Sequence, residues 1–406
     1  MFSELFGSVF GLIISTAVMW VPIALLIVAW YTWRHYSLVK YISKQEWVLL
    51  EVRLPKEINK SPKAMEVILE AMNQGYEGTW YSRFWEGTVR TWFSLEVVSL
   101  EGRVHFFIRT ISLFKNLVEA TIYAQYPDLE IYEVPDYTYS IDYRGDNKDW
   151  KLWGMELKLD KPDPYPIKTY TDYGLDKDSL KEEFKVDPMA SMIEFLGSLG
   201  PGEFCWTQIM IRSTKGRLKA KGFGLEKVTW KDEGKDLMKE LKNAGQVEVG
   251  GVFKFADRTD VDNEVIKAIG KSIAKTGFDT GIRAIYVAKK ENFKLSNQLA
   301  MGNTFSQYGT QNLNKFGKAH TTGFEFPWQH WPGNLGLGFT EQDLKRRMFN
   351  AYRLRSYFYY PYPKRQFVLN TEELATVYHF PGGVVTTPTL GRIESAKSEP
   401  PANLPV

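Results

Sequence analysis

The chain has very little of the chemistry on which most enzymes rely. Its 406 residues include a single cysteine, Cys205, which cannot form an intrachain disulfide and fits a reducing compartment. One cysteine also cannot complete a zinc site, and no two histidines stand at a metal-ligand spacing such as H-x-x-x-H. We therefore predict no metal and no cofactor. Cys205 stands inside the apolar run Phe204–Ile211 and is expected to be a small core residue.

Sequence signatures of nucleotide hydrolysis and acyl transfer are also missing. Gly270-Lys271-Ser272 has the ending of a P-loop, but Val265 stands where the first glycine is needed. The G-x-S-x-G elbow of serine hydrolases is absent as well. A catalytic triad assembled from distant residues is not visible in a sequence. On these grounds we expect that the chain is not an enzyme.

Charged residues are missing from one long run, Val9–Trp33. A helix of this length spans ~37 Å, which is enough to cross a hydrocarbon core of ~30 Å. A cleaved signal peptide and a buried core helix are the alternatives. A signal peptide has a basic start and a shorter apolar run, whereas only Glu4 is charged ahead of this one. We predict a transmembrane helix over residues 9–33.

Aromatic residues and then cations follow the end of this run, as they do where a spanning helix leaves the bilayer. The positive-inside rule predicts that residues 1–8 lie outside the cytoplasm and that the C-terminal part lies inside it, at the inner cell membrane. The lipid bilayer is therefore the first expected partner. The predicted anchor belt consists of Trp30, Tyr31, Trp33, Arg34 and Lys40.

Periodic patterns predict a first domain over residues 47–135, after a juxtamembrane linker at residues 34–46. Strand, helix, strand, strand, helix and strand follow one another, with a hairpin turn at Glu101-Gly102. This is the order of a ferredoxin-like (split βαβ) domain, in which two helices cover one face of an antiparallel sheet. The other face is either covered by another segment or open for docking, and it carries Trp92, His105, Phe107 and Arg109.

Residues 150–320 predict strand, helix, strand, helix and strand, with a further helix predicted over residues 292–313, and we interpret this order as a second unit of the same kind. We therefore predict an α+β fold with a single N-terminal transmembrane helix followed by tandem ferredoxin-like domains, the second one elaborated. A Lys- and Gly-rich insertion at residues 214–250 includes a predicted helix over residues 230–243. This insertion is a candidate nucleic-acid contact.

The remaining residues, 321–406, predict an aromatic loop, a basic helix and an extended C-terminal arm beyond Pro381. The basic helix, Glu341–Tyr357, is either a solvated face or a contact for a protein, lipid or nucleic acid. Asn370 and Glu373 predict a capping box at the start of another helix. The candidate partner or nucleic-acid contacts are Lys345, Arg346, Arg347, Arg353 and Arg355, and the candidate interaction segment contains Asn370, Glu373, Tyr378 and His379.

Several segments resemble the N-terminal region of bacterial type IV secretion and conjugation ATPases. The most specific is Phe367–Pro405, FVLNTEELATVYHFPGGVVTTPTLGRIESAKSEPPANLP, which in those proteins lies just before the nucleotide-binding core. Asp187–Arg212 and Gly277–Phe293 resemble the preceding domain. The resemblance implies a membrane-anchored region that works without a P-loop domain of its own, and it transfers no catalytic residue.

The expected function is a non-catalytic adaptor or assembly subunit. It would dock a P-loop ATPase, or another secretion subunit, at the cytoplasmic face of the membrane. A self-assembling membrane scaffold that forms a homo-oligomer is one alternative. A membrane-tethered nucleic-acid-binding protein is the other.

Overall fold

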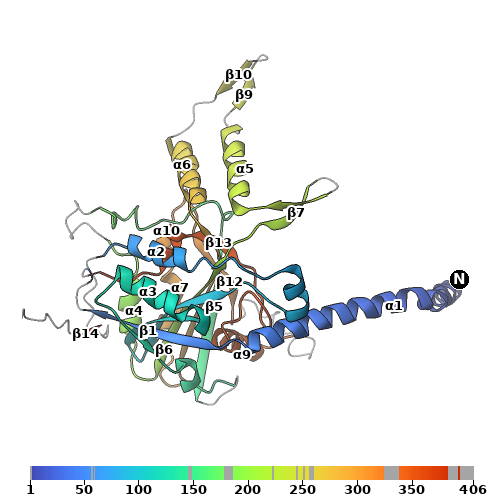
Figure 1. Cartoon of the computed structure of the whole chain (residues 1–406), viewed down its shortest axis with the longest axis horizontal. Helices are drawn as coiled ribbons and strands as arrows, with labels where there is room; N and C mark the ends of the chain where they lie inside the picture. The colour runs from blue at the N-terminus through green and yellow to red at the C-terminus, as the bar shows by residue number, and fades with distance from the viewer. Residues whose placement is uncertain are drawn as a thin grey trace, which may run out of the picture. The chain divides into compact units, whose positions relative to one another are not determined.

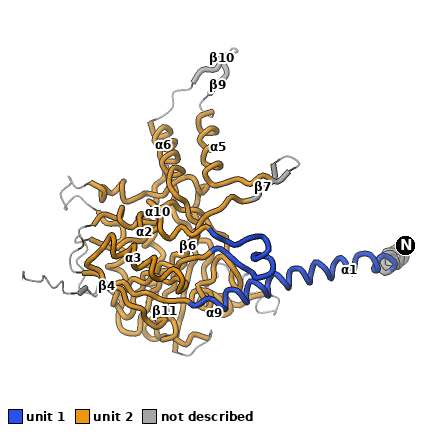
Figure 2. Tube along the Cα trace, viewed as in Figure 1, with its two compact units in different colours: residues 1–46, 76–90 blue, residues 47–75, 91–406 orange. Residues whose placement is uncertain are grey.

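The computed structural model describes residues 2–55, 58, 60–144, 149–177, 186–221, 224–243, 246–249, 252–255, 260–323, 338–382 and 392–393. It is an α+β protein with one long, apolar N-terminal helix. The chain divides into two compact units (Figures 1 and 2), residues 1–46 with 76–90 and residues 47–75 with 91–406. The predicted aromatic loop and most of the predicted arm beyond Pro381 lie outside the described residues.

The first unit consists of helix α1 (Phe2–Ser43) and segment 76–90, which carries the π-helical turn η1 (Ser82–Glu86). α1 runs without a break through most of the predicted linker. Gly87 has a φ of 74°, and a Cβ atom there would lie 2.2 Å from the backbone oxygen of Ser37. Only glycine permits this approach. The close contact explains why Ser37 is 3% exposed on a helix whose neighbouring side chains are open.

The second unit is built on one sheet that is antiparallel except where β14 joins β1. Within the described residues the strand order is β12-β5-β11-β6-β2-β3-β1-β14, with β13 also beside β11 and β4 also beside β1. The strands are β1 (Trp47–Pro55), β2 (Trp92–Leu100), β3 (Arg103–Ile111), β4 (Glu130–Glu133), β5 (Trp150–Leu159), β6 (Glu203–Ser213), β11 (Gly277–Lys289), β12 (Phe316–Thr321), β13 (Phe367–Asn370) and β14 (Arg392–Ile393).

Both halves of this sheet repeat one arrangement of strands. In the first half β4, β1, β3 and β2 lie side by side, and in the second half β12, β5, β11 and β6 do the same. The halves join through the antiparallel β2–β6 pair, which runs from Trp92 opposite Arg212 to Leu100 opposite Phe204. The predicted order of strands and helices is present in the first half, whereas the second half ends on β12, a strand that the sequence did not predict.

The predicted hairpin between β2 and β3 is confirmed. Its two turn residues, Glu101 and Gly102, both have positive φ, at 54° and 86°. That pair of left-handed residues is typical of the type I′ turn, whose twist matches that of the flanking strands. A Cβ atom on Gly102 would lie 2.4 Å from the backbone oxygen of Leu199, so the turn also has no room for a side chain.

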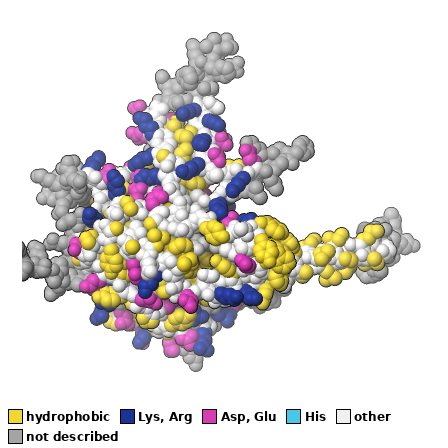
Figure 3. Space-filling model, viewed as in Figure 1, with side chains coloured by type: hydrophobic (Ala, Val, Ile, Leu, Met, Phe, Trp, Pro, Cys, Tyr) yellow, Lys and Arg dark blue, Asp and Glu magenta, His cyan; other side chains and the backbone are white. Residues whose placement is uncertain are grey.

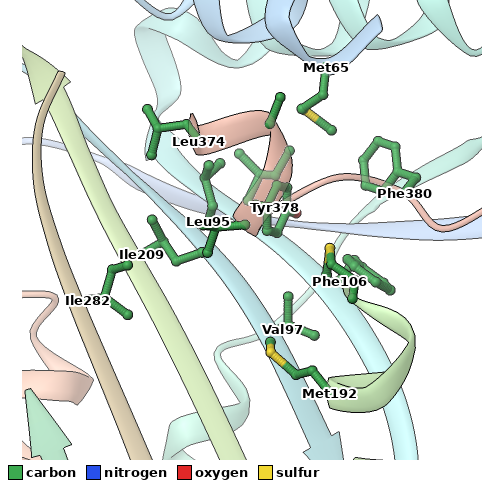
Figure 4. Close-up of a cluster of buried hydrophobic side chains, with 14 of the residues drawn as sticks. Met65, Leu95, Val97, Phe106, Met192, Ile209, Ile282, Leu374, Tyr378 and Phe380 are labelled. Carbon is green, nitrogen blue, oxygen red and sulfur yellow. The ribbon is translucent and has the colours of Figure 1, made fainter. Parts of the chain in front are cut away.

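Helices pack against one face of the sheet and bury the larger of two cores. α10 lies in the middle of this core, where Leu374 and Tyr378 contact apolar side chains from the strands and from α2 (Figure 4). These helices are α2 (Lys63–Ala71), α3 (Lys115–Gln125), α4 (Ala190–Gly197), α7 (Leu295–Asn303) and α10 (Thr371–Val377). The helix predicted over residues 292–313 is present but shorter than predicted, because α7 ends at Asn303 in a stretch rich in the weak helix formers Gly and Asn.

The opposite face of the sheet is covered as well. Helix α9 (Glu341–Arg353) and the segment after β4 bury a second core there. Phe107 of β3 stacks on Tyr137 with ring centroids 4.9 Å apart, and Trp206 packs on Tyr352 at 5.4 Å. Of the two alternatives for this face, the covered one is therefore correct.

The insertion between β6 and β11 contains two hairpins and a pair of packed helices (Figure 1). The predicted helix over residues 230–243 is confirmed as α5 (Trp230–Asn243), which packs against α6 (Asp260–Ala274). Hairpin β7–β8 (Arg217–Lys221 and Gly224–Val228) precedes α5, and hairpin β9–β10 (Gln246–Val249 and Val252–Phe255) connects the two helices.

Candidate membrane anchor and docking cleft

Helix α1 meets the physical requirements for a membrane span. Its Ser15–Ser43 stretch is long and apolar enough to cross a bilayer, and its most hydrophobic part is not buried in the described part of the chain. Val18 and Ile23 are 83% and 59% exposed. Apolar side chains in a run of this length are normally removed from water, either in a core or in lipid. The helix is therefore a candidate anchor by length, composition and exposure.

The residues of the predicted anchor belt are all exposed on α1. Trp30, Tyr31 and Trp33 lie on the last turns of the apolar run, and Arg34 and Lys40 follow on the same helix. Segment 76–90 packs against this part of α1. The ring centroids of Trp30 and Phe84 are 4.3 Å apart, and those of Trp33 and Trp85 are 5.6 Å apart. Sequence reasoning missed this segment, although four aromatic residues within residues 80–85 were a usable signal.

The cations of α9 differ in how much charge they leave available. Lys345 pairs with Glu341 at 2.5 Å, and Arg346 pairs with Asp343 at 2.5 Å, so both are neutralised within the helix. The guanidinium of Arg347 instead lies over the ring of Phe339, 4.3 Å from its centroid. Arg353 lies 5.6 Å from the ring of Tyr139.

Arg355 does not lie on this surface, so its prediction as a contact residue is wrong. Its side chain is completely buried and donates from Nε to Glu96 at 2.9 Å, with a further ion pair to Asp136. Burial lowers the pKa of Arg355, but Glu96 and Asp136 outweigh burial and hold that pKa well above its ordinary value. Tyr137 also donates to Glu96, at 2.7 Å. Arg355 thus joins the end of α9 to the sheet.

A cleft of about 580 Å³ opens between β12 and α9. It is lined by residues 319–323, by the α9 side chains Leu344, Arg347, Met348 and Ala351, by residues 361–364 and by Glu156. Glu156 is already neutralised, by Arg283 at 2.7 Å and Lys364 at 2.8 Å. Arg347 and His320 also line the cleft, and the Glu156 carboxylate is already paired with two cations. The cleft therefore suits a ligand segment that carries acidic side chains.

The candidate interaction segment around α10 lies in the core. Asn370, Glu373, Tyr378 and His379 are each at most 2% exposed. The predicted capping box is confirmed: the Asn370 side chain accepts from the Glu373 amide at 2.9 Å, and Glu373 accepts from the Asn370 amide at 2.8 Å. The segment is buried because β13 pairs with β11, which carries α10 in between α2 and the sheet.

Cys205 is buried in the larger core, as predicted, with its sulfur 3.3 Å from that of Met301. Burial raises the pKa of its thiol, which disfavours the reactive thiolate. Within the part of the chain that the structure describes, no group of three or more His, Cys, Asp and Glu side chains could hold a metal ion.

A family model described as "Domain of unknown function (DUF8128)" matches residues 36–391, which is most of the chain and begins just after the apolar run of α1. No curated protein matches the chain.

Proposed function

The chain belongs to the DUF8128 family, and we propose that it is a single-pass, membrane-anchored adaptor that docks a partner and carries out no catalysis itself. The observation that carries this proposal is the exposed apolar surface of α1, whose most hydrophobic stretch is not buried in the described part of the chain. Arg34 and Lys40 after the apolar run support a cytoplasmic body at the inner cell membrane.

The partner that we propose is a P-loop ATPase of the type IV secretion and conjugation kind, or another subunit of such a machine. The resemblance of Phe367–Pro405 to the segment that precedes the motor in those ATPases supports this choice. We also propose that each half of the sheet is a ferredoxin-like unit. The strand order β4-β1-β3-β2 and its repeat as β12-β5-β11-β6 support that assignment.

The docking surface that we propose is the cleft between β12 and α9. Arg347 lines it without an acidic partner on its own helix turn, and the stacking on Phe339 holds its guanidinium in place. An acidic segment of the partner would form charge-assisted hydrogen bonds with that guanidinium. Arg346, one residue away, is paired with Asp343 and does not line the cleft, so it provides a matched control.

Affinity purification of the full chain from detergent-solubilised membranes tests the proposal. We expect a P-loop ATPase to co-purify with the unmodified chain and with Arg346→Glu, and to be reduced at least fivefold with Arg347→Glu. Failure to recover an ATPase in several detergents would contradict the adaptor function. Equal recovery of the ATPase with both variants would support the adaptor function but would contradict the cleft as its docking site.

The nucleic-acid alternative is less well supported by the geometry of α9. Two of its cations are already paired with Glu341 and Asp343, which leaves fewer charges to displace counterions from phosphates. A binding assay with duplex DNA at two salt concentrations separates the alternatives. Binding that weakens steeply with salt would favour nucleic acid over a protein partner.

A further inference from the structure

The first unit presents large aromatic side chains to its surroundings on both of its segments. In Figure 3 hydrophobic side chains line α1 and gather around the base of this helix. An exposed apolar patch of this kind normally marks a surface that contacts protein or membrane. The exposed rings are Trp30 at 49%, Tyr31 at 70%, Tyr76 at 77%, Trp80 at 67%, Tyr81 at 61% and Trp85 at 49%.

Segment 76–90 packs against one short stretch of α1. Phe84 is central, because its ring lies 4.3 Å from Trp30 and stacks on Trp80 at 5.7 Å. At the other end of η1, the backbone of Gly87 rests on that of Ser37. The outward rings of Trp80 and Tyr81 are thus displayed by a segment that is fixed to α1.

In a membrane-spanning α1, the stretch that segment 76–90 contacts would lie at the edge of the bilayer. Trp30 and Ser37 are seven residues apart, which corresponds to ~10 Å along a helix. Trp30 lies at the end of the apolar run, and each headgroup layer is ~5–8 Å thick. Trp and Tyr favour this layer, because the ring is apolar and its edge is a hydrogen-bond donor.

We propose that segment 76–90 is a second membrane contact, an aromatic collar seated in the lipid headgroup layer around the exit of α1. The proposal rests on the proposed anchoring through α1. Lipid is the occupant, because the exposed rings continue the exposed apolar surface of α1. Two contacts at one bilayer face restrict the tilt and depth of the anchor more than a single helix does.

Site-specific fluorescence in the full chain tests the collar. Buried Cys205 provides an unreactive background, so single cysteines can be added at Glu86 in the collar, Ile23 on α1 and Tyr139 in the other unit, which are all exposed. Each variant carries an environment-sensitive nitrobenzoxadiazole label. The protein is reconstituted in vesicles of phosphatidylcholine and phosphatidylglycerol that contain lipids with a spin-label quencher at a shallow or a deep position.

We expect strong quenching of the Ile23→Cys label by deep lipids and at least twofold stronger quenching of the Glu86→Cys label than of the Tyr139→Cys label by shallow lipids. Equal quenching at Glu86 and Tyr139, with Ile23 still quenched, would overturn the collar and leave the anchor intact. An unquenched label at Ile23 would instead contradict the anchor itself. Adding Gly87→Ala to Glu86→Cys separates the segment from α1, and the shallow quenching should then fall to the Tyr139 level.

Discussion

Glu372 and Glu373 are neighbours on α10, yet their surroundings shift the pKa of their carboxyls in opposite directions. Burial raises the pKa of Glu372, but hydrogen bonds from Lys275, Thr169 and Lys271 outweigh burial and lower that pKa to about 2. Burial dominates at Glu373, because its partners are backbone amides, and raises its pKa to about 8. One carboxyl therefore stabilises the fold when ionised and the other when protonated.

Glu372→Gln should lower stability at neutral pH and flatten the loss of stability in acid. The folded pKa lies below the ordinary 4.5, so the contribution of Glu372 is present above that value and is lost as pH falls toward 2. We expect a loss of roughly 2–3 kcal/mol at pH 7. Urea unfolding in detergent at pH 7, 5 and 3 measures it. A difference between the variant and the unmodified chain that stays constant over this range would contradict the assignment.

Glu373→Gln should act at the other end of the pH range. The folded pKa of Glu373 lies above the ordinary 4.5, so its contribution is complete below that value and is lost as pH rises through about 8. The glutamine side chain does not titrate, although at every pH it disturbs one of the two hydrogen bonds that the Glu373 side chain accepts from backbone amides. The informative quantity is therefore the slope: between pH 5 and 9 the unmodified chain should lose more stability than the variant. Parallel curves for the two proteins would refute this prediction.

Arg355→Gln should be among the most destabilising single changes in the chain. Arg355 and Glu96 are both completely buried, and the change leaves the Glu96 carboxylate without its cation. Removing one partner of a buried ion pair costs about 3–5 kcal/mol. Arg144 is the control, because its ion pair to Asp142 is exposed and Arg144→Gln should leave the midpoint of urea unfolding unchanged. A similar midpoint for both variants would show that the buried pair contributes nothing.

Gly102→Ala should destabilise the β2–β3 hairpin. The new Cβ atom would meet the Leu199 backbone oxygen at 2.4 Å at a residue with a φ of 86°. Strain of this kind costs about 1–3 kcal/mol. Gly75→Ala serves as the comparison, because its Cβ would meet only the Ser213 hydroxyl, at 3.3 Å, without a left-handed backbone. Thermal unfolding of the two variants checks the prediction, which fails if their midpoints coincide.

Local patterns in the sequence predicted what depends on neighbouring residues. Alternating residues around Glu101-Gly102 predicted a hairpin that is present, and the spacing of Asn370 and Glu373 predicted a capping box that is present. The apolar run Val9–Trp33 likewise predicted a helix, and α1 covers the whole run. In each case the signal and the structure lie within a few residues of one another.

Burial of charged and polar residues depended instead on contacts between distant parts of the chain. Arg355 reads as one more cation of a basic helix, but Glu96 and Asp136, more than 200 residues earlier, make it a core residue. The α10 segment reads as a candidate interaction segment, and only the pairing of β13 with β11 carries it into the core. Pairings of this range have no signature in a single sequence.

The account depends most on α1 being a membrane anchor, and alkaline carbonate extraction of membranes tests this directly. The unmodified chain should remain in the membrane pellet. A variant with Val18→Arg and Ile23→Arg should move to the supernatant, because each arginine near the middle of a span costs about 2.5–3.5 kcal/mol. Release of the unmodified chain by carbonate would contradict membrane anchoring through α1.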